Sequence, residues 1–222
     1  MANKGFKKQI FTQFSQIAKA LSNGHRLELL ELLAQGDRSV EQLASLSGLS
    51  VANTSQHLQN LRRSGLVDTR SEGHHVYYRL SDYHIMEIIG LIQKIAHKNL
   101  GAIDQLITTY LTCKDDLQPM SRDELLAKVR KGLVTVVDVR PEEEYQSGHL
   151  PNAINIELGK LKEQLSQIPS DKQVIAYCRG PFCVLAFDAV KQLRALGYEA
   201  QRLEDGFPEW KLEGLPVETP DP

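Results

Sequence analysis

The spacing of apolar residues changes near residue 113, and this change constrains the fold more than any other feature. Before it, apolar residues recur at helical intervals, as in Leu27, Leu30 and Leu33. After it, continuous apolar runs such as residues 133–138 alternate with helical stretches, a pattern typical of buried parallel strands in α/β proteins. A chain of 222 residues is long enough for two domains. The sequence therefore predicts two domains of different class.

A polar segment that ends in proline marks the predicted boundary. Residues 113–119 read Cys-Lys-Asp-Asp-Leu-Gln-Pro, a composition typical of a linker. We expect residues 1–112 to form a mainly α-helical domain. Residues 120–222 are expected to form an α/β domain with a mostly parallel sheet.

The pattern also predicts individual elements. In the first domain we expect a β-hairpin from residues 66–69 and 76–80, followed by one helix over about 83–111. In the second domain, Ser121 is placed to cap a short helix. Further strands are expected at 133–138, 153–156, 174–177 and 200–203, and further helices at 158–167 and 182–196.

Composition sets the class of protein. Hydrophobic residues make up 41% and charged residues 24% of the chain, as in proteins that bury packed cores. We find no apolar run of the roughly 18 to 20 residues that a membrane span needs and no signal-peptide pattern at the start, so we expect a cytoplasmic protein without a membrane partner. Three cysteines are too few for a disulfide framework and are either buried or chemically active.

Charge is distributed unevenly along the chain. Residues 1–113 hold 12 Lys and Arg against 9 Asp and Glu, whereas residues 114–222 hold 14 against 19. The first part is thus +3 and carries six of the seven histidines, and the second part is −5. This asymmetry is expected if only the first part binds a polyanion, although solvated surfaces reach +3 by chance.

The spacing of residues 40–64 predicts a helix-turn-helix. Residues 40–47 form a short helix, Gly48 and Leu49 a tight turn, and Ser50 the N-cap of a second helix that ends near Ser64. In this second helix we expect Val51, Leu58 and Leu61 to face inward.

The outer face of the second helix is rich in hydrogen-bonding groups that suit base edges and phosphates. An ordinary amphipathic helix with a solvated polar face is the alternative interpretation. The hairpin that follows would act as a wing that reaches the phosphate backbone or a neighbouring groove. The predicted DNA contacts are Ser50, Asn53, Thr54, Ser55, Gln56, His57, Gln59, Arg62 and Arg63 on the helix and Arg70, His74 and Arg79 on the hairpin.

Several blocks of the first domain together resemble the ArsR family of winged-helix repressors over about residues 10–100. They are Leu-Ser-Asn-Gly-His-Arg-Leu-Glu-Leu-Leu-Glu-Leu-Leu at 21–33, the turn at Gly48, Ser-Gln-His-Leu at 55–58, Leu-Arg-Arg-Ser-Gly-Leu-Val at 61–67 and Gly-His-His-Val-Tyr-Tyr-Arg at 73–79. The resemblance implies a homodimer packed through the first and last helices, here residues 6–21 and 83–111. It also implies a two-fold operator with one recognition helix in each half-site.

Many ArsR-type proteins sense metals, so the family's ligand positions matter. The cysteine pair near the first helix of the motif is missing, because no cysteine precedes Cys113. Asp82-Tyr-His84 matches the first half of a second family site. The later ligand positions of that site hold Ile95 and Lys98, and His97 does not fall at either position. We therefore interpret Asp82 and His84 as the start of a helix and expect no metal and no cofactor.

The second domain resembles a single-domain rhodanese over about residues 120–217. Five blocks in the expected order carry the resemblance: Asp138-Val-Arg140, Glu144-Tyr145, residues 148–155, Tyr177-Cys-Arg-Gly-Pro-Phe-Cys183 and residues 203–210. The resemblance implies that Cys178 carries sulfur.

Cys178 is the predicted nucleophile and persulfide carrier. It follows a buried strand and precedes a helix, so the backbone N–H groups of residues 179–184 and the positive end of the helix dipole should lower the pKa of its thiol. The thiolate would then take sulfur from thiosulfate, a persulfide or a polysulfide. The alternative is an inert buried thiol.

The loop departs from related sequences at two positions. Phosphatases of the same fold place an arginine six residues after the cysteine, where this chain has Val184, so phosphate chemistry is disfavoured. Rhodaneses often place a basic residue five positions after it, where this chain has Cys183. This change argues against efficient thiosulfate turnover and supplies a possible resolving thiol, although Cys183 is alternatively a small apolar residue of the helix.

The remaining residues have lesser expected roles. Arg179 is a possible anion contact or an ordinary loop arginine. Asp138, Arg140 and His149 are expected to support the scaffold. Cys113 would either join a neighbouring chain's thiol across the dimer or stay idle.

Three functional hypotheses follow. The first is a sequence-specific DNA-binding regulator in which sulfur uptake or oxidation at Cys178 modulates DNA binding. The second is a rhodanese-type sulfurtransferase carried on a DNA-binding module. The third is an inactive rhodanese fold used as an interaction module, and the intact cysteine loop argues against it.

Overall fold

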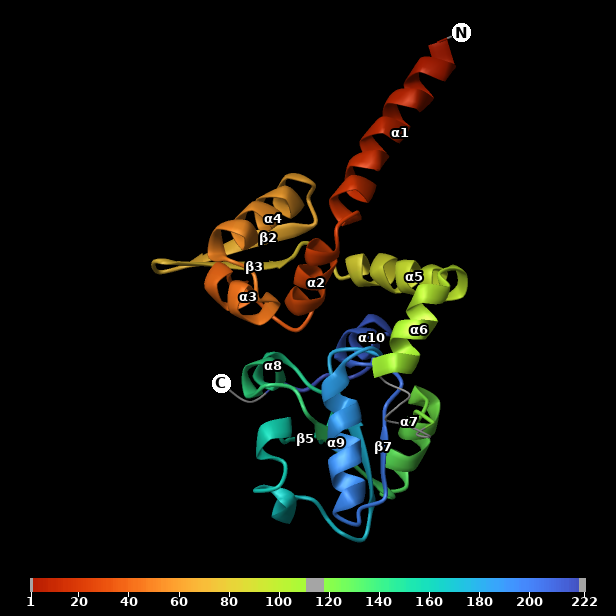
Figure 1. Ribbon diagram of the computed structural model, residues 1–222. Helices are drawn as coiled ribbons and strands as arrows, with labels where there is room; N and C mark the ends of the chain where they lie inside the picture. Colours follow the sequence, from red (N-terminus) through yellow and green to blue (C-terminus); the bar gives the residue numbers. More distant parts are fainter. Residues whose placement is uncertain (1, 111–117, 220–222) are drawn as a thin grey trace. The chain divides into compact units, whose positions relative to one another are not determined.

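The computed structural model describes residues 2–110 and 118–219 (Figure 1). The chain divides into two compact units, residues 1–89 and 90–222, and the division lies inside helix α5 (His84–Asn99). It thus precedes the predicted linker at 113–119. Cys113 lies outside the described residues.

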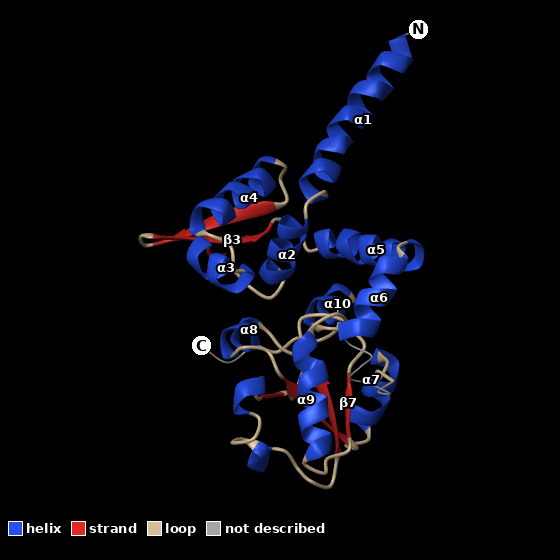
Figure 2. Cartoon of the chain, in the orientation of Figure 1, coloured by secondary structure: helices blue, strands red, loops and turns tan. Residues whose placement is uncertain are grey.

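The first unit combines helices with a small antiparallel sheet (Figure 2). The strand order is β1-β3-β2, in which β2 and β3 form the predicted hairpin and β1 is an additional short strand. Its elements are α1 (Ala2–Leu21), α2 (Gly24–Leu33), β1 (Arg38–Ser39), α3 (Val40–Ser47), α4 (Val51–Arg63), β2 (Val67–Glu72), β3 (His75–Leu80) and the start of α5.

Local sequence signals fix the helix-turn-helix. Ser39 and Gln42 form a reciprocal capping box at the start of α3. Gly48 ends this helix in the left-handed conformation with φ +69°, which costs glycine little because it has no β-carbon. The Ser50 hydroxyl accepts the Asn53 N–H and so caps α4, as predicted.

Leucines from α2, α3 and α4 form the centre of the first unit's core. Leu29, Leu30, Leu43, Leu58 and Leu61 are fully buried, and this close packing sets the angle at which α4 is presented. Truncation of such a leucine to alanine typically costs about 2–5 kcal/mol.

The second unit is built on four parallel strands in the order β5-β4-β6-β7, in agreement with the predicted α/β class. Its elements after α5 are α6 (Gly101–Tyr110), α7 (Arg122–Arg130), β4 (Val134–Asp138), α8 (Glu142–Ser147), β5 (Ile154–Asn155), the 3₁₀ turns η2 (Leu158–Lys160) and η3 (Leu165–Gln167), β6 (Gln173–Tyr177), α9 (Val184–Ala195), β7 (Ala200–Arg202) and α10 (Phe207–Leu212). Ser121 caps α7, as predicted.

Two predicted helices were wrong. The single helix over 83–111 is instead two helices that meet at Leu100, where α5 ends at Asn99 and α6 begins at Gly101. The Asn99 side chain donates to the Ile95 carbonyl at the end of α5, and glycine has low helix propensity. The helix over 158–167 is instead the two 3₁₀ turns η2 and η3, in a stretch where Gly159 lowers helix propensity.

The sheet of the second unit has a core on each face. Val137, Val174 and Ala176 pack in a cluster that includes residues of α9, whereas Val136 and Ile175 pack in a cluster with residues of α7 and α10. This alternation follows from the two-residue period of a strand. Within the described residues, no helix is both long enough and apolar enough to cross a bilayer.

Candidate functional sites: the cysteine loop and the recognition helix

Cys178 lies at the end of a central strand. It follows the last residue of β6, is 2% exposed and belongs to the α9-side core. Its carbonyl oxygen accepts the Phe207 N–H at 3.0 Å. The strand thus places Cys178 at the carboxyl end of the sheet, where its backbone is hydrogen-bonded to the first residue of α10.

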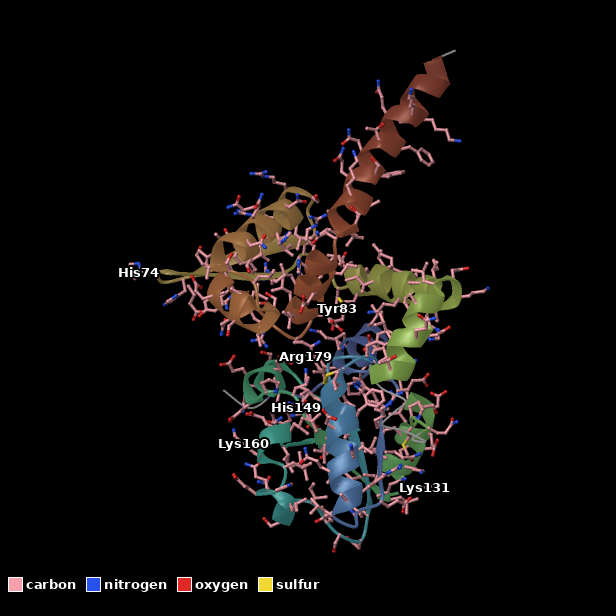
Figure 3. The ribbon with its side chains drawn as sticks, in the orientation of Figure 1. His74, Tyr83, Lys131, His149, Lys160 and Arg179 are labelled. Carbon is pink, nitrogen blue, oxygen red and sulfur yellow. A yellow bond between two sulfur atoms is a disulfide. The ribbon has the colours of Figure 1, made fainter. Side chains whose placement is uncertain are left out.

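A disulfide joins Cys178 to Cys183 across a short loop (Figure 3). Their Cα atoms are 6.2 Å apart, and the Cys183 N–H donates to the Gly180 carbonyl at 3.1 Å. Cys183 is the N-cap of α9, so this helix begins at Val184, later than predicted. Cys183 is thus bonded to Cys178 and also packs against the α9-side core, and its role as a resolving thiol stays a prediction.

The loop rests directly on Gly206. A β-carbon added to Gly206 would stand 2.2 Å from the Gly180 nitrogen and 2.4 Å from the Arg179 carbonyl carbon. Real β-carbons do not approach so closely, so only glycine allows the two backbones to meet there. Gly206 therefore helps to define the conformation of the loop.

Arg179 is bound to Glu144 on α8. Its Nη2 and Nε atoms lie 2.7 Å and 2.9 Å from the two carboxylate oxygens, and the Glu144 side chain is fully buried. An anion bound by Arg179, the role predicted from the sequence, would have to compete with the carboxylate of Glu144. The arrangement makes Arg179 an anchor that holds the loop to α8.

Asp138 and Arg140 form a fully buried ion pair next to Tyr177. The Arg140 Nη2 atom lies 2.6 Å from the Asp138 carboxylate and 2.8 Å from the Gly148 carbonyl oxygen, and the Tyr177 hydroxyl donates to Asp138. Burial lowers the pKa of Arg140, but the charge and hydrogen bond of Asp138, with the nearby Tyr177 and Glu144, together outweigh this effect and raise the pKa above its usual value. Burial, and then Asp138, raise the pKa of Tyr177 well above its usual value.

His149 packs within the same part of the unit. Its ring stacks on Tyr145 at 3.6 Å, and its Nε2 atom lies 3.8 Å from the Glu218 carboxylate. These contacts, like the ion pair of Asp138 and Arg140, are those of residues that support a scaffold.

The recognition helix α4 presents most of the predicted polar residues to solvent. Ser50, Asn53, Gln56, Gln59, Arg62 and Arg63 are exposed, and Ser55 and His57 are partly exposed.

Two predictions for α4 were wrong. Thr54 is fully buried and its hydroxyl donates to the Ser50 carbonyl at 3.0 Å, so it can face the core without an unsatisfied polar group. Val51 is 48% exposed in the first turn of the helix. The inward positions are therefore Thr54, Leu58 and Leu61, and Thr54 is not a candidate for DNA contact.

His25 and Arg26 lie beside the recognition helix and were missed by the sequence analysis. The rings of His25 and His57 are 5.7 Å apart. Burial, then Arg26 and His25, lower the pKa of His57. Gly-His-Arg begins α2, but nothing in the spacing of the sequence indicated that α2 and α4 would place His25, Arg26 and His57 together.

The hairpin forms a wing with a two-residue turn at Gly73 and His74. Glu72 pairs with His75, and Gly73 has φ +59°, as at the first central position of a type II′ turn. His74 lies at the tip (Figure 3), and Arg79 is exposed.

The charge of Arg70 is paired within the unit, which the sequence analysis did not foresee. Its guanidinium lies 2.8 Å from Glu72 and 3.3 Å from Asp37, and these two hydrogen bonds, with Glu72 the larger cause, raise the pKa of Arg70. The predicted phosphate contact of Arg70 would have to compete with these carboxylates.

Asp82 and His84 begin helix α5. The Asp82 carboxylate accepts the His84 N–H at 2.9 Å and lies 2.7 Å from the His84 ring, and the hydrogen bond to Asp82 raises the pKa of His84. Among the described residues, no three His, Cys, Asp or Glu side chains are grouped so that they could hold a metal ion.

Comparison with known proteins identifies both domains. The model of the bacterial regulatory protein, arsR family, matches residues 23–69, and the model of the rhodanese-like domain matches residues 121–213. The HTH-type transcriptional regulator Rv0324 of Mycobacterium tuberculosis is 42% identical over 97% of this chain and 95% of that protein. The chain is a transcriptional regulator of the ArsR family. It also carries a rhodanese-like domain.

Other proteins resemble one domain of this ArsR-family regulator. The transcriptional activator HlyU of Vibrio cholerae is 40% identical over 36% of this chain and 73% of that protein. A sulfurtransferase of Allochromatium vinosum is 30% identical over 40% of this chain and 81% of that protein. The solution structure of the homodimeric winged helix-turn-helix domain of Mb0332 from Mycobacterium bovis is 39% identical, covers 42% of this chain and 87% of that chain, and has a TM-score of 0.40.

Proposed function

We propose that this ArsR-family regulator binds operator DNA as a homodimer and that its affinity responds to the sulfur or oxidation state of Cys178 and Cys183. The observation that carries the proposal is the bond between these cysteines in the rhodanese-like loop of a chain that also carries a recognition helix. A domain that both accepts sulfur and forms a disulfide has two chemical states, which is the minimum that a sensor requires.

The loop supports a balanced two-step reaction. In the first step, the Cys178 thiolate attacks the outer sulfur of a persulfide R–S–SH, which gives Cys178–S–SH and releases the thiolate R–S⁻. In the second step, Cys183 loses its proton to solvent and attacks the Cys178 sulfur. The disulfide then forms and hydrosulfide leaves.

Persulfide or polysulfide fits this loop better than thiosulfate. Thiosulfate carries two negative charges, and a binding site for it would need positive charge. Here the charge of Arg179 is balanced by Glu144, and Cys183 takes the position that is often basic.

Two helix surfaces support the homodimer proposal. Phe6, Phe11 and Phe14 on α1 are 60–64% exposed, and Leu91 and Ile95 on α5 are 53% and 62% exposed. Large apolar side chains that are grouped and exposed on one helix typically mark an interface. In the dimer, each α4 would present Asn53, Gln56, Gln59 and its neighbouring polar residues to one half-site, with His74 and Arg79 at the phosphates.

A gel-shift titration with and without polysulfide tests the proposal. For the wild type we expect the operator affinity to change by roughly 5- to 150-fold, the usual range of coupling between two sites. Cys178→Ser should show no change, and Cys113→Ser serves as the matched control that keeps both loop cysteines. The same response of wild type and Cys178→Ser would contradict a sensing role for this loop.

The second candidate function is a sulfurtransferase carried on a DNA-binding module. The likeness to the sulfurtransferase of Allochromatium vinosum favours it. It predicts catalytic transfer of sulfur to cyanide and DNA binding that is indifferent to persulfidation. A turnover assay, run beside the gel shift, separates the two functions.

A further inference from the structure

The two sulfur atoms of the disulfide belong to residues in unequal surroundings. Cys178 is 2% exposed and packs within the α9-side core. Cys183 packs against the same core but is partly exposed, at the N-cap of α9 between Phe182 and Val184, which are 42% and 44% exposed. A reagent from solution therefore meets Cys183 first.

We propose that a reducing thiol opens the disulfide by attack on Cys183, so that Cys183 is the site of mixed-disulfide modification and Cys178 is the leaving thiolate. The inference deepens the proposed function, because it assigns the step that resets the same loop. It names a chemical class of reactant, a thiol, and a regiochemistry that the rhodanese resemblance does not supply.

The reset is balanced in atoms and electrons. The thiolate R–S⁻ forms a bond to the Cys183 sulfur, the bond between Cys183 and Cys178 breaks, and Cys178 leaves as a thiolate. A second thiolate then attacks the sulfur of the bound R group, which releases R–S–S–R and the Cys183 thiolate. The two thiols supply the two electrons that reduce the disulfide, and solvent supplies the protons of the resulting cysteines.

Access favours this direction. Thiol–disulfide exchange depends on which sulfur can be reached, and attack on Cys178 would have to reach a residue that is almost completely buried. Attack on Cys183 starts at a residue that is partly exposed.

The fixed surroundings of Cys178 support its role as the retained thiolate. Its carbonyl oxygen accepts the Phe207 N–H, and the next residue, Arg179, is held by the buried Glu144. Reduction through Cys183 requires no movement of this part of the loop. It returns Cys178 as a thiolate, the form that accepts sulfur in the proposed function.

Trypsin makes the two sites separately measurable. It cuts after Lys172, Arg179 and Lys191, so Cys178 falls on the peptide of residues 173–179 and Cys183 on the peptide of residues 180–191. The full-length Cys113→Ser protein is oxidised, and intact mass spectrometry verifies the loss of two hydrogens. Glutathione is added for short times, acid stops the exchange, and free thiols are alkylated before digestion.

We expect glutathione on Cys183 in at least roughly tenfold excess over Cys178 at the earliest times. A second arm uses a thioredoxin whose resolving cysteine is replaced by serine, and the covalent complex should again form on Cys183. The ratio of the rate of modification by glutathione to the rate of complex formation with the thioredoxin variant tells whether a small thiol or a protein thiol is the better reductant. Equal labelling, or labelling mainly on Cys178, would overturn the inference, as would failure of the oxidised protein to form the disulfide.

Single-cysteine variants give an independent measurement that later exchange cannot scramble. In the Cys113→Ser background, Cys178→Ser leaves only Cys183, and Cys183→Ser leaves only Cys178. A small and a bulky maleimide should react at similar rates with the first variant, whereas the bulky reagent should be roughly tenfold slower than the small one with the second, and the reverse pattern would contradict the unequal access on which the inference rests. None of these measurements involves DNA. If the gel shift shows no response to polysulfide, the site of thiol attack can still be determined. If the thiol attacks Cys178 instead, a gel-shift response to polysulfide still supports the proposed function.

Discussion

Gly206 and Gly180 lie in backbone contact, with no room for a side chain on Gly206. The two residues come from segments that are distant in sequence, the turn before α10 and the loop between the cysteines. Their contact fixes the loop that holds Cys178 and Cys183 against the end of the sheet.

The variant Gly206→Ala should therefore disturb the loop. We expect a loss of stability of about 1–3 kcal/mol, as for other overpacked sites, together with slower persulfide uptake by Cys178. Gly159→Ala is the matched control, because a β-carbon at Gly159 meets nothing within 4 Å. Thermal unfolding and timed mass spectrometry measure both effects. Similar behaviour of the two variants would show that the contact does not constrain the loop.

Loss of Arg179 should destabilise the second unit, because it removes the positive charge that is hydrogen-bonded to the buried Glu144 carboxylate. Arg179→Gln is expected to cost about 2–4 kcal/mol, somewhat less than a fully buried pair because Arg179 is 22% exposed. Denaturant unfolding of Arg179→Gln, Glu144→Gln and the double variant forms a cycle that isolates the interaction. The double variant should be more stable than the sum of the single losses implies. Strict additivity would refute the coupling.

Arg63 and Arg70 should contribute unequally to DNA binding. Arg63 is exposed at the end of α4, whereas Arg70 is engaged by Asp37 and Glu72. Arg63→Ala should reduce the slope of log affinity against log salt concentration by about 1, as expected for one lost phosphate contact. Arg70→Ala should change this slope less. Fluorescence anisotropy at several salt concentrations provides the measurement, and a larger effect at Arg70 would contradict the assignment.

His57 should make the first unit less stable in acid. Its pKa in the folded protein is lowered, first by burial, so the unfolded chain binds the proton more strongly. The stabilisation is present above the unfolded pKa, near 6.5, and is lost as the pH falls from there toward the folded value. His57→Gln should flatten the stability profile in this window relative to wild type. His74→Gln, at the tip of the wing, is the control, and an equal change in both variants would exclude the mechanism.

The exposed phenylalanines of α1 should support dimerisation rather than the fold of the monomer. Phe11→Ser combined with Phe14→Ser is expected to shift the sedimentation equilibrium toward monomer, because their apolar surface is buried only in a dimer. The far-ultraviolet circular dichroism should stay close to that of wild type. Gln13→Ser on the same helix is the control. An unchanged dimer in the double variant would place the interface elsewhere.

Much of the fold could be predicted from local sequence. Ser50 and Ser121 indicated where helices begin, and the apolar run at 133–138 indicated a buried strand, because capping and strand burial depend on residues that are close in the chain. Cys178 and Cys183 could also be identified as candidate site residues, because both lie in the short segment between a predicted strand and a predicted helix.

The interactions that modify these predictions join distant residues. Glu144 reaches Arg179 across 35 positions, and Asp37 reaches Arg70 across 33. Thr54 faces the core of the first unit and Val51 faces solvent, the reverse of what their hydrophobicity predicts. The Thr54 hydroxyl can be buried because it donates to the Ser50 carbonyl, a contact that hydrophobicity alone does not reveal.

The alternation of β6 separates two kinds of chemistry between neighbouring residues. Tyr177 belongs to one core and reaches the ion pair of Asp138 and Arg140, whereas Cys178 belongs to the core on the opposite face. Bonds at the sulfur can therefore be made and broken without access of solvent or reagent to the buried charges, whose separation would be costly. The sheet separates the reacting sulfur from the ion pair of Asp138 and Arg140, so the loop can pass through many cycles of sulfur chemistry while this ion pair stays intact.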